Sequence, residues 1–85
     1  MKNLSTLELK KILLDYANED LQILKENSCS AIADTKLGCL HNTYENGVFN
    51  IRYNVSPYLF STTNESDLLD FFANSYQNVI KNIKF

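Results

Sequence analysis

Residues 44–55 read YENGVFNIRYNV, in which an Asn-Gly pair is followed by apolar residues at every second position. Asn46-Gly47 favours a two-residue type I′ turn, because both central residues need positive φ and these two residue types tolerate it best. The pair therefore predicts a β-hairpin in which Tyr44 faces Phe49. From this register the other cross-strand partners follow in both directions.

Strand side chains alternate between the two faces of a sheet, so the register also sorts the hairpin residues. One face would be apolar apart from Asn42 and would carry Leu40, Tyr44, Phe49, Ile51, Tyr53 and Val55. The other face would be polar and would carry Cys39, His41, Thr43, Glu45, Asn50, Arg52 and Asn54. A sheet of this kind covers a core on one side and leaves its second side in solvent.

The segment before the hairpin predicts a long amphipathic helix from about residue 6 to 26. Ser5 and Glu8 have the spacing of a capping box, in which each side chain bonds the backbone N–H of the other residue. Apolar residues then recur at three- and four-residue steps, at Leu9, Ile12, Leu13, Tyr16, Ala17, Leu21 and Leu24. Its outer stripe would hold Glu8, Lys11, Asp15, Glu19, Gln22 and Glu26.

A second helix is predicted after the polar run STTNES, with Asn64 as the N-cap and Thr62 as the alternative. Acidic residues in its first turns suit the positive end of the helix dipole. Its buried stripe would consist of Leu68, Leu69, Phe72, Tyr76, Val79, Ile80 and Ile83.

Between these elements, residues 28–37 fit a first strand, although their alanines also allow a helix. Pro57 ends the third strand because it cannot donate to a ladder, and YLFS after it fits a short edge strand. Both helices need an apolar surface, and the apolar sheet face supplies one. The sequence thus predicts one α+β domain over residues 1–85, a two-layer sandwich of N-terminal helix, three- to four-stranded antiparallel sheet and C-terminal helix.

Composition argues against several classes of function. With 85 residues, a net charge of −2 and a single Arg, the chain lacks the basic footprint of a nucleic-acid binder. It has no apolar run that could span a membrane and no signal-peptide pattern, so a cytoplasmic location is expected. We expect Cys29 and Cys39 to be free thiols, and neither a metal set nor a phosphate-binding loop is evident, so no cofactor is expected.

An enzyme would have one candidate site, at Cys39, His41 and Asn54 on the polar face, since these are the residue types of a nucleophilic triad. Same-face neighbours two apart on one strand lie about 7 Å from each other, beyond the roughly 3 Å contact that a general base needs. We therefore expect no enzymatic activity.

Three surfaces are candidates for binding a protein partner. One is the acidic outer face of the first helix at Asp15 and Glu19, with Asp20 beside them. The others are the acidic start of the second helix, at Glu65, Asp67 and Asp70, and the polar sheet face, at Asn50, Arg52 and Asn54. Carboxylates would dock on a basic protein groove, whereas the polar rows would hydrogen-bond a partner beside an extendable sheet edge.

The order of an Asn-Gly turn, a Ser/Thr/Asn-rich run and Asn64-Glu65-Ser66 entering a helix with Phe72 and Tyr76 resembles small phage-encoded anti-CRISPR proteins. The resemblance implies a three-stranded antiparallel sheet between helices and acidic side chains that occupy the DNA-binding groove of a CRISPR effector nuclease. The matching residues here would be Glu65, Asp67 and Asp70.

We therefore expect a small non-enzymatic inhibitor of phage or mobile-element origin that binds a protein partner, such as a CRISPR effector complex, as a monomer or homodimer. The alternative is a self-associating structural or assembly subunit. A Cys/His-based enzyme is the third hypothesis.

Overall fold

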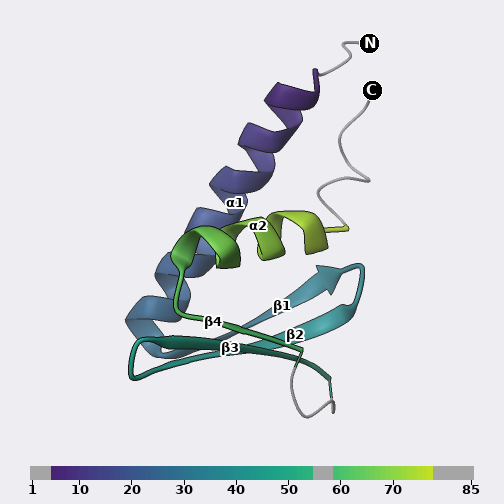
Figure 1. Cartoon of the computed structure of the whole chain (residues 1–85). Helices are drawn as coiled ribbons and strands as arrows, with labels where there is room; N and C mark the ends of the chain where they lie inside the picture. The colour runs from purple at the N-terminus through teal and green to yellow at the C-terminus, as the bar shows by residue number, and fades with distance from the viewer. Residues whose placement is uncertain (1–4, 55–58, 78–85) are drawn as a thin grey trace.

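The computed structural model describes residues 5–54 and 59–77. Their elements are, in chain order, α1 (Thr6–Asn27), β1 (Cys29–Thr35), β2 (Gly38–Glu45), β3 (Val48–Tyr53), β4 (Phe60–Thr62) and α2 (Glu65–Ser75). The strands form one antiparallel sheet in the order β1-β2-β3-β4, and the helices lie over one of its faces (Figure 1). The predicted α+β fold is confirmed, with four strands, and residues 29–35 form a strand.

The central hairpin has the predicted register, with Tyr44 opposite Phe49. Asn46 has φ 53° and Gly47 has φ 79°, as a type I′ turn requires. The Tyr44 and Phe49 rings stack with their centroids 4.3 Å apart. Turn chemistry and cross-strand packing therefore specify the same alignment of β2 and β3.

β4 is the short edge strand expected after Pro57, and it pairs with β3. Phe60 lies opposite Ile51 on the core side and stacks on Phe71 of α2 with ring centroids 4.6 Å apart. This residue is therefore part of the packing between β4 and α2. Pro57 and the residues on either side of it, 55, 56 and 58, lie outside the described residues.

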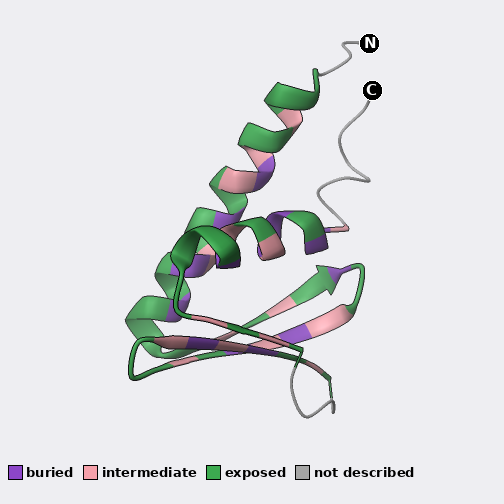
Figure 2. Cartoon of the chain, in the orientation of Figure 1, coloured by how far each residue is buried: buried purple, intermediate pink, exposed green. Residues whose placement is uncertain are grey.

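The core lies between the two helices and the apolar sheet face. α1 contacts β1 and β2, whereas α2 contacts β4 and ends beside Lys36, just after β1. Figure 2 shows the buried positions following one side of α1 and the central strands. The buried apolar residues are Leu13, Ala17, Leu21, Leu24, Leu40, Phe49, Ile51, Leu68, Phe72, Ala73 and Tyr76.

The second helix ends earlier than its apolar periodicity predicts. α2 stops at Ser75, and Tyr76 is extended, with φ −62° and ψ 131°. Tyr76 pairs instead with Thr35 at the end of β1. The N–H of Lys36 donates to the Ser75 carbonyl at 2.7 Å, and the N–H of Gln77 donates to the Asp34 carbonyl at 3.1 Å.

The prediction that Tyr76 continues the helical stripe is therefore wrong, although its side chain is buried. The Tyr76 N–H still donates to the Phe72 carbonyl at 3.2 Å, but the Gln77 N–H and the Ser75 carbonyl bond residues 34 and 36 in place of helical partners. Val79, Ile80 and Ile83, which were predicted on the same stripe, lie outside the described residues. Neither helix in the described part of the chain is long and apolar enough to cross a membrane.

Candidate protein-binding surfaces

The outer face of α1 carries a row of acidic side chains. Asp15 and Glu19 are exposed on it, as predicted, and Glu8 and Glu26 extend the row in both directions. These residues recur at steps of seven, four and seven, so they share one side of a helix with 3.6 residues per turn. We call Glu8, Asp15, Glu19 and Glu26 the acidic row.

Asp20 does not belong to this row. Its carboxylate accepts a hydrogen bond from the Tyr76 hydroxyl, and the Tyr76 ring packs edge-on against Tyr16 with centroids 6.5 Å apart. Burial raises the pKa of Asp20, and the hydrogen bond from Tyr76 opposes that rise. Asp20 thus lies beside the acidic row, close enough to Glu19 to feel its charge, and its carboxylate joins α1 to the chain after α2.

The acidic start of α2 contacts a lysine of α1. Asn64 caps the helix as predicted, with its Oδ1 accepting from the Ser66 N–H at 2.8 Å. Glu65 forms an ion pair with Lys25 at 3.1 Å. Asp67 is exposed. Glu65 is thus already paired within the molecule, while Asp67 keeps its carboxylate toward solvent.

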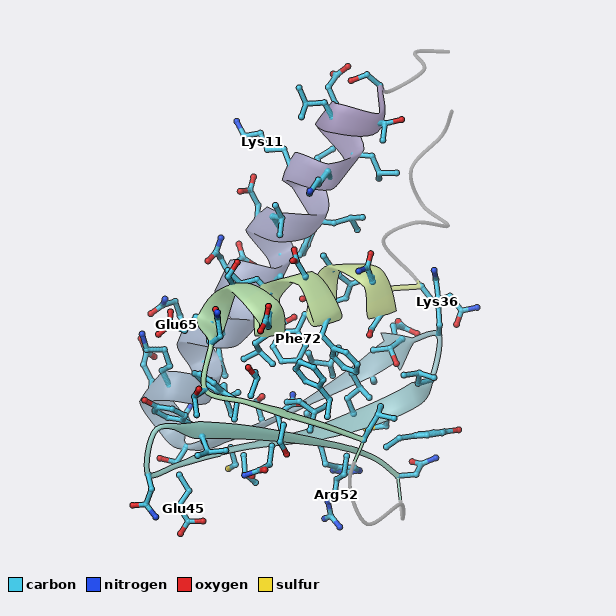
Figure 3. All side chains as sticks on the ribbon, viewed as in Figure 1. Lys11, Lys36, Glu45, Arg52, Glu65 and Phe72 are labelled. Carbon is cyan, nitrogen blue, oxygen red and sulfur yellow. The ribbon has the colours of Figure 1, made fainter. Side chains whose placement is uncertain are left out.

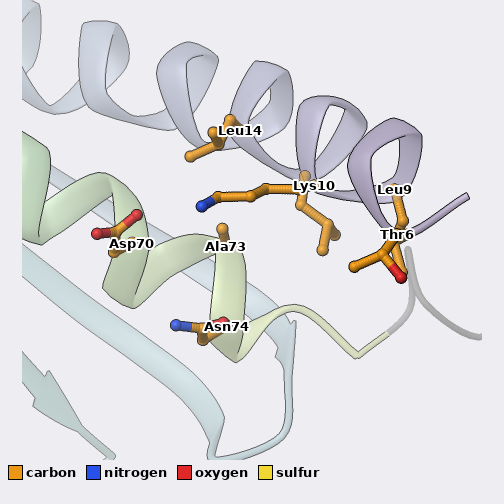
Figure 4. Close-up of a pocket in the computed structure, with 8 residues that line it drawn as sticks. Thr6, Leu9, Lys10, Leu14, Asp70, Ala73 and Asn74 are labelled. Carbon is orange, nitrogen blue, oxygen red and sulfur yellow. The ribbon is translucent and has the colours of Figure 1, made fainter.

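Asp70, the third acidic residue predicted on α2, lines a groove between the two helices. Lys10 of α1 lines the same groove, and its side chain runs along it toward α2 (Figure 4). The groove has a volume of about 410 Å³. Its lining also includes Leu9, Leu13, Leu14 and Ala73. The floor of this groove is therefore apolar, and its rim carries one charge of each sign.

Acidic residues are concentrated in the helical layer. Of the ten in the chain, all but Asp34 and Glu45 lie in α1 or α2, where the basic residues are Lys10, Lys11 and Lys25. Figure 3 shows Glu65 on the helical side and Glu45 and Arg52 on the side of the sheet. The two layers of the sandwich thus differ in charge.

The polar sheet face has the predicted residues in the predicted rows. Arg52 lies opposite His41 and is exposed. Asn50 lies next to Ser61 of β4, whose hydroxyl donates to the Asn50 Oδ1 at 2.7 Å. Asn54 follows β3 in a left-handed conformation with φ 48°. No helix of the described part of the chain covers this face (Figure 1).

The Cys39 and His41 pair shows no sign of an assembled nucleophile. Both residues lie on β2, and Cys29 and Cys39 are free cysteines, as expected. Among the described residues no hydrogen bond joins the side chains of Cys39, His41 and Asn54, and no group of three or more His, Cys, Asp or Glu could hold a metal ion. These side chains contribute instead to the polar surface.

Two side-chain contacts between distant parts of the chain were not predicted from the sequence. Lys25–Glu65 joins residues 40 apart, and Tyr76–Asp20 joins residues 56 apart. Periodicity places each residue on a face of its own element, but it does not say which element lies beside that face.

Comparison with protein-family models, with curated proteins and with solved structures finds no match for this chain.

Proposed function

We propose that this chain is a small non-enzymatic inhibitor that binds a protein partner through the acidic outer surface of its helices. The concentration of carboxylates in the helical layer is the observation that supports this proposal. A basic groove of the partner would be attracted to this layer and not to the sheet, which gives the encounter an orientation. The DNA-binding groove of a CRISPR effector nuclease is the partner that the resemblance to phage anti-CRISPR proteins implies.

The spacing of the charges limits the mechanism. The acidic row runs from Glu8 to Glu26, which is 18 steps of α1 or about 27 Å at 1.5 Å per residue, and it holds four carboxylates in that length. Duplex DNA carries one charge per roughly 1.7 Å of its axis. The row is thus far too sparse to imitate a duplex, and the proposed inhibitor docks on part of a basic surface without reproducing the charge density of DNA.

A pull-down with the tagged chain from host cells, washed at moderate salt and read by mass spectrometry, tests the proposal. Recovery of one nuclease or defence complex is expected, and the purified complex should lose DNA binding when the chain is added. Recovery of the chain alone would contradict the inhibitor proposal and favour the self-associating subunit. Retention of DNA binding by the recovered complex would also contradict it.

Charge reversal locates the surface once a partner is in hand. Asp15→Lys with Glu19→Lys is expected to weaken binding about tenfold or more, mainly by slowing association. Asp34→Lys with Glu45→Lys is the matched control, because it makes the same change in net charge at exposed positions of the sheet layer. Equal losses in both variants would mean that only net charge matters.

The same test separates the candidate surfaces. Asp67→Lys with Asp70→Lys is expected to weaken binding if the start of α2 takes part in the contact. Unchanged affinity in both helical variants would instead point to Asn50, Arg52 and Asn54 on the polar sheet face as the binding residues.

A further inference from the structure

The outer edge of β1 has no partner strand over its first residues. β1 is one edge of the sheet, and among the described residues only 75–77 pair with its outer side, at Asp34 to Lys36. That short pairing shows that this edge accepts an antiparallel strand. It leaves residues 29–33 without one in the described part of the chain.

The backbone of this stretch points outward at alternate residues. The Tyr44 N–H donates to the Ser28 carbonyl at 2.9 Å, and Cys29 lies opposite Thr43 in the same register. Hydrogen-bonded and non-hydrogen-bonded pairs alternate along antiparallel strands. The N–H and C=O groups of Cys29 and Ala31 therefore face away from β2, toward the open edge.

Residues 29–33, which read CSAIA, carry no side chain of the kind that usually protects an edge strand, and the register shift in β1 comes only at their end, between Ile32 and Thr35. Edges in monomeric proteins commonly carry Lys, Pro or an inward-pointing charge that blocks further pairing. This stretch has no charge and no proline, and the side chains that it exposes to solvent are small. Cys29, Ala31 and Ala33 are exposed.

Apolar side chains are also exposed on the α1 flank beside this edge. Leu24 is buried, and the next residue, Lys25, reaches α2. Ile23, the residue before Leu24, therefore lies on the opposite flank of α1, away from Lys25 and its contact with α2. Ile23 is 46% exposed and Tyr16 is 48% exposed. Tyr16 packs against Tyr76, which pairs with β1, and this contact places the flank on the β1 side of the molecule.

We propose that the open edge of β1 and the Ile23 flank of α1 bind a second copy of this chain, with the two β1 strands antiparallel across a two-fold axis. The two sheets would become one continuous sheet with both helical layers on the same side. Each Ile23 would then lie on the side of α1 that faces the other copy.

A second copy fits this surface better than a charged partner does. A two-fold interface must be self-complementary, and an uncharged stretch places no like charges opposite each other when it pairs with itself. Glu19 and Glu26 of the acidic row lie one turn of α1 before and after Ile23, so they border the flank, and the uncharged part of the interface is the strand pairing of residues 29–33. The patch is small, so we expect a weak dimer that forms as the concentration rises.

Sedimentation analysis of the purified full chain over a wide concentration range tests the proposal. The average mass is expected to rise from that of the 9.8 kDa chain toward twice that value. Ala31→Lys and Ile23→Lys are each expected to raise the dimer dissociation constant about tenfold or more, because a lysine at the edge or on the flank meets its own copy across the axis.

Matched controls carry the same new charge elsewhere. Thr43→Lys is the control for Ala31→Lys, since Thr43 is exposed on the same sheet face but lies on the internal strand β2. Leu7→Lys is the control for Ile23→Lys, because Leu7 is 79% exposed at the other end of α1. Both controls should dimerise like the wild type, and circular dichroism melts should show that all four variants fold.

A chain that stays monomeric at every concentration would overturn the proposal. So would a dimer that Leu7→Lys disrupts while Ala31→Lys and Ile23→Lys leave it intact, because the interface would then lie elsewhere on α1. Neither result bears on the binding of a foreign partner, which is measured separately.

Discussion

The contact between Tyr76 and Asp20 joins the end of α2 to α1 through two titratable groups. Burial, and next the hydrogen bond to Asp20, raise the pKa of the Tyr76 hydroxyl above its usual value of 10.0. A tyrosine in the unfolded chain ionises near that value, whereas folded Tyr76 stays protonated to higher pH. The stability that comes from this group is therefore complete below pH 10 and is lost as the pH rises above it.

Tyr76→Phe tests this linkage. At pH 7 the variant is expected to be less stable by about 1 to 2 kcal/mol, because the partly buried Asp20 carboxylate loses its donor. The free energy of unfolding, measured in urea from pH 7 to pH 11, should fall less steeply above pH 10 for the variant than for the wild type. Parallel curves would show that Tyr76 does not titrate differently in the folded and unfolded states.

Asp20→Asn is the control, because it keeps an acceptor for the Tyr76 hydroxyl and removes the charge. Since the pKa of Asp20 is raised above 3.8 in the folded state, its favourable contribution is complete below pH 3.8 and is lost as the pH rises. At pH 7 the charge therefore costs stability, and Asp20→Asn should be more stable than Tyr76→Phe.

Among the elements, the two turns that flank β2 each depend on a glycine with positive φ, but they differ in the space around it. Gly47 has φ 79° and no heavy atom within 4 Å of the place where a Cβ would stand. Gly38 has φ 95°, and a Cβ there would lie 3.0 Å from the Tyr53 ring. Alanine at Gly47 would therefore meet only backbone strain, whereas alanine at Gly38 would also meet the ring.

We expect Gly47→Ala to lower the free energy of unfolding by about 1 to 2 kcal/mol, the cost of a left-handed conformation for a residue with a Cβ. Gly38→Ala is expected to cost at least about 1 kcal/mol more, because the Tyr53 ring must also move. Urea unfolding at neutral pH measures both values. Equal losses would mean that the ring moves freely and that only the backbone conformation matters.

The hairpin could be predicted from the sequence because its turn and its alternation are local and agree with each other. The end of α2 could not, because Tyr76 continues the apolar period while its backbone pairs with β1, which is distant in the chain. Asn42 lies between these cases. Its place on the apolar face was evident from alternation, but its Nδ2 bond to Ser30 at 3.0 Å required the partner strand to be known.

For the candidate surfaces, the sequence predicted exposure and face correctly but not neighbours. Asp15 and Glu19 lie on the outside of α1, as periodicity requires. Glu65 was expected to be available to a partner, yet Lys25 already pairs with it. Only the packing of α1 beside α2 reveals such a contact, and that packing depends on side chains from both helices and the sheet.

At the scale of the whole molecule, the two proposed surfaces differ in charge. The acidic row is charged and lies on the outside of the helical layer, whereas the β1 edge is uncharged over residues 29–33. Salt screens exposed charges strongly, with a screening length of about 10 Å at 0.1 M ionic strength. Apolar contacts and backbone pairing across a strand edge are not weakened in this way.

Sodium chloride should therefore affect the two associations differently in the same protein. Raising the salt is expected to lower the affinity for a basic partner several-fold, while the mass measured for the chain alone stays the same or rises, because two copies of net charge −2 repel each other less. Isothermal titration with the partner and sedimentation without it, at matched salt concentrations, provide the comparison. A dimer that dissociates together with the partner complex as salt rises would mean that both associations use the charged helical surface, and the β1 edge would then have no part in either.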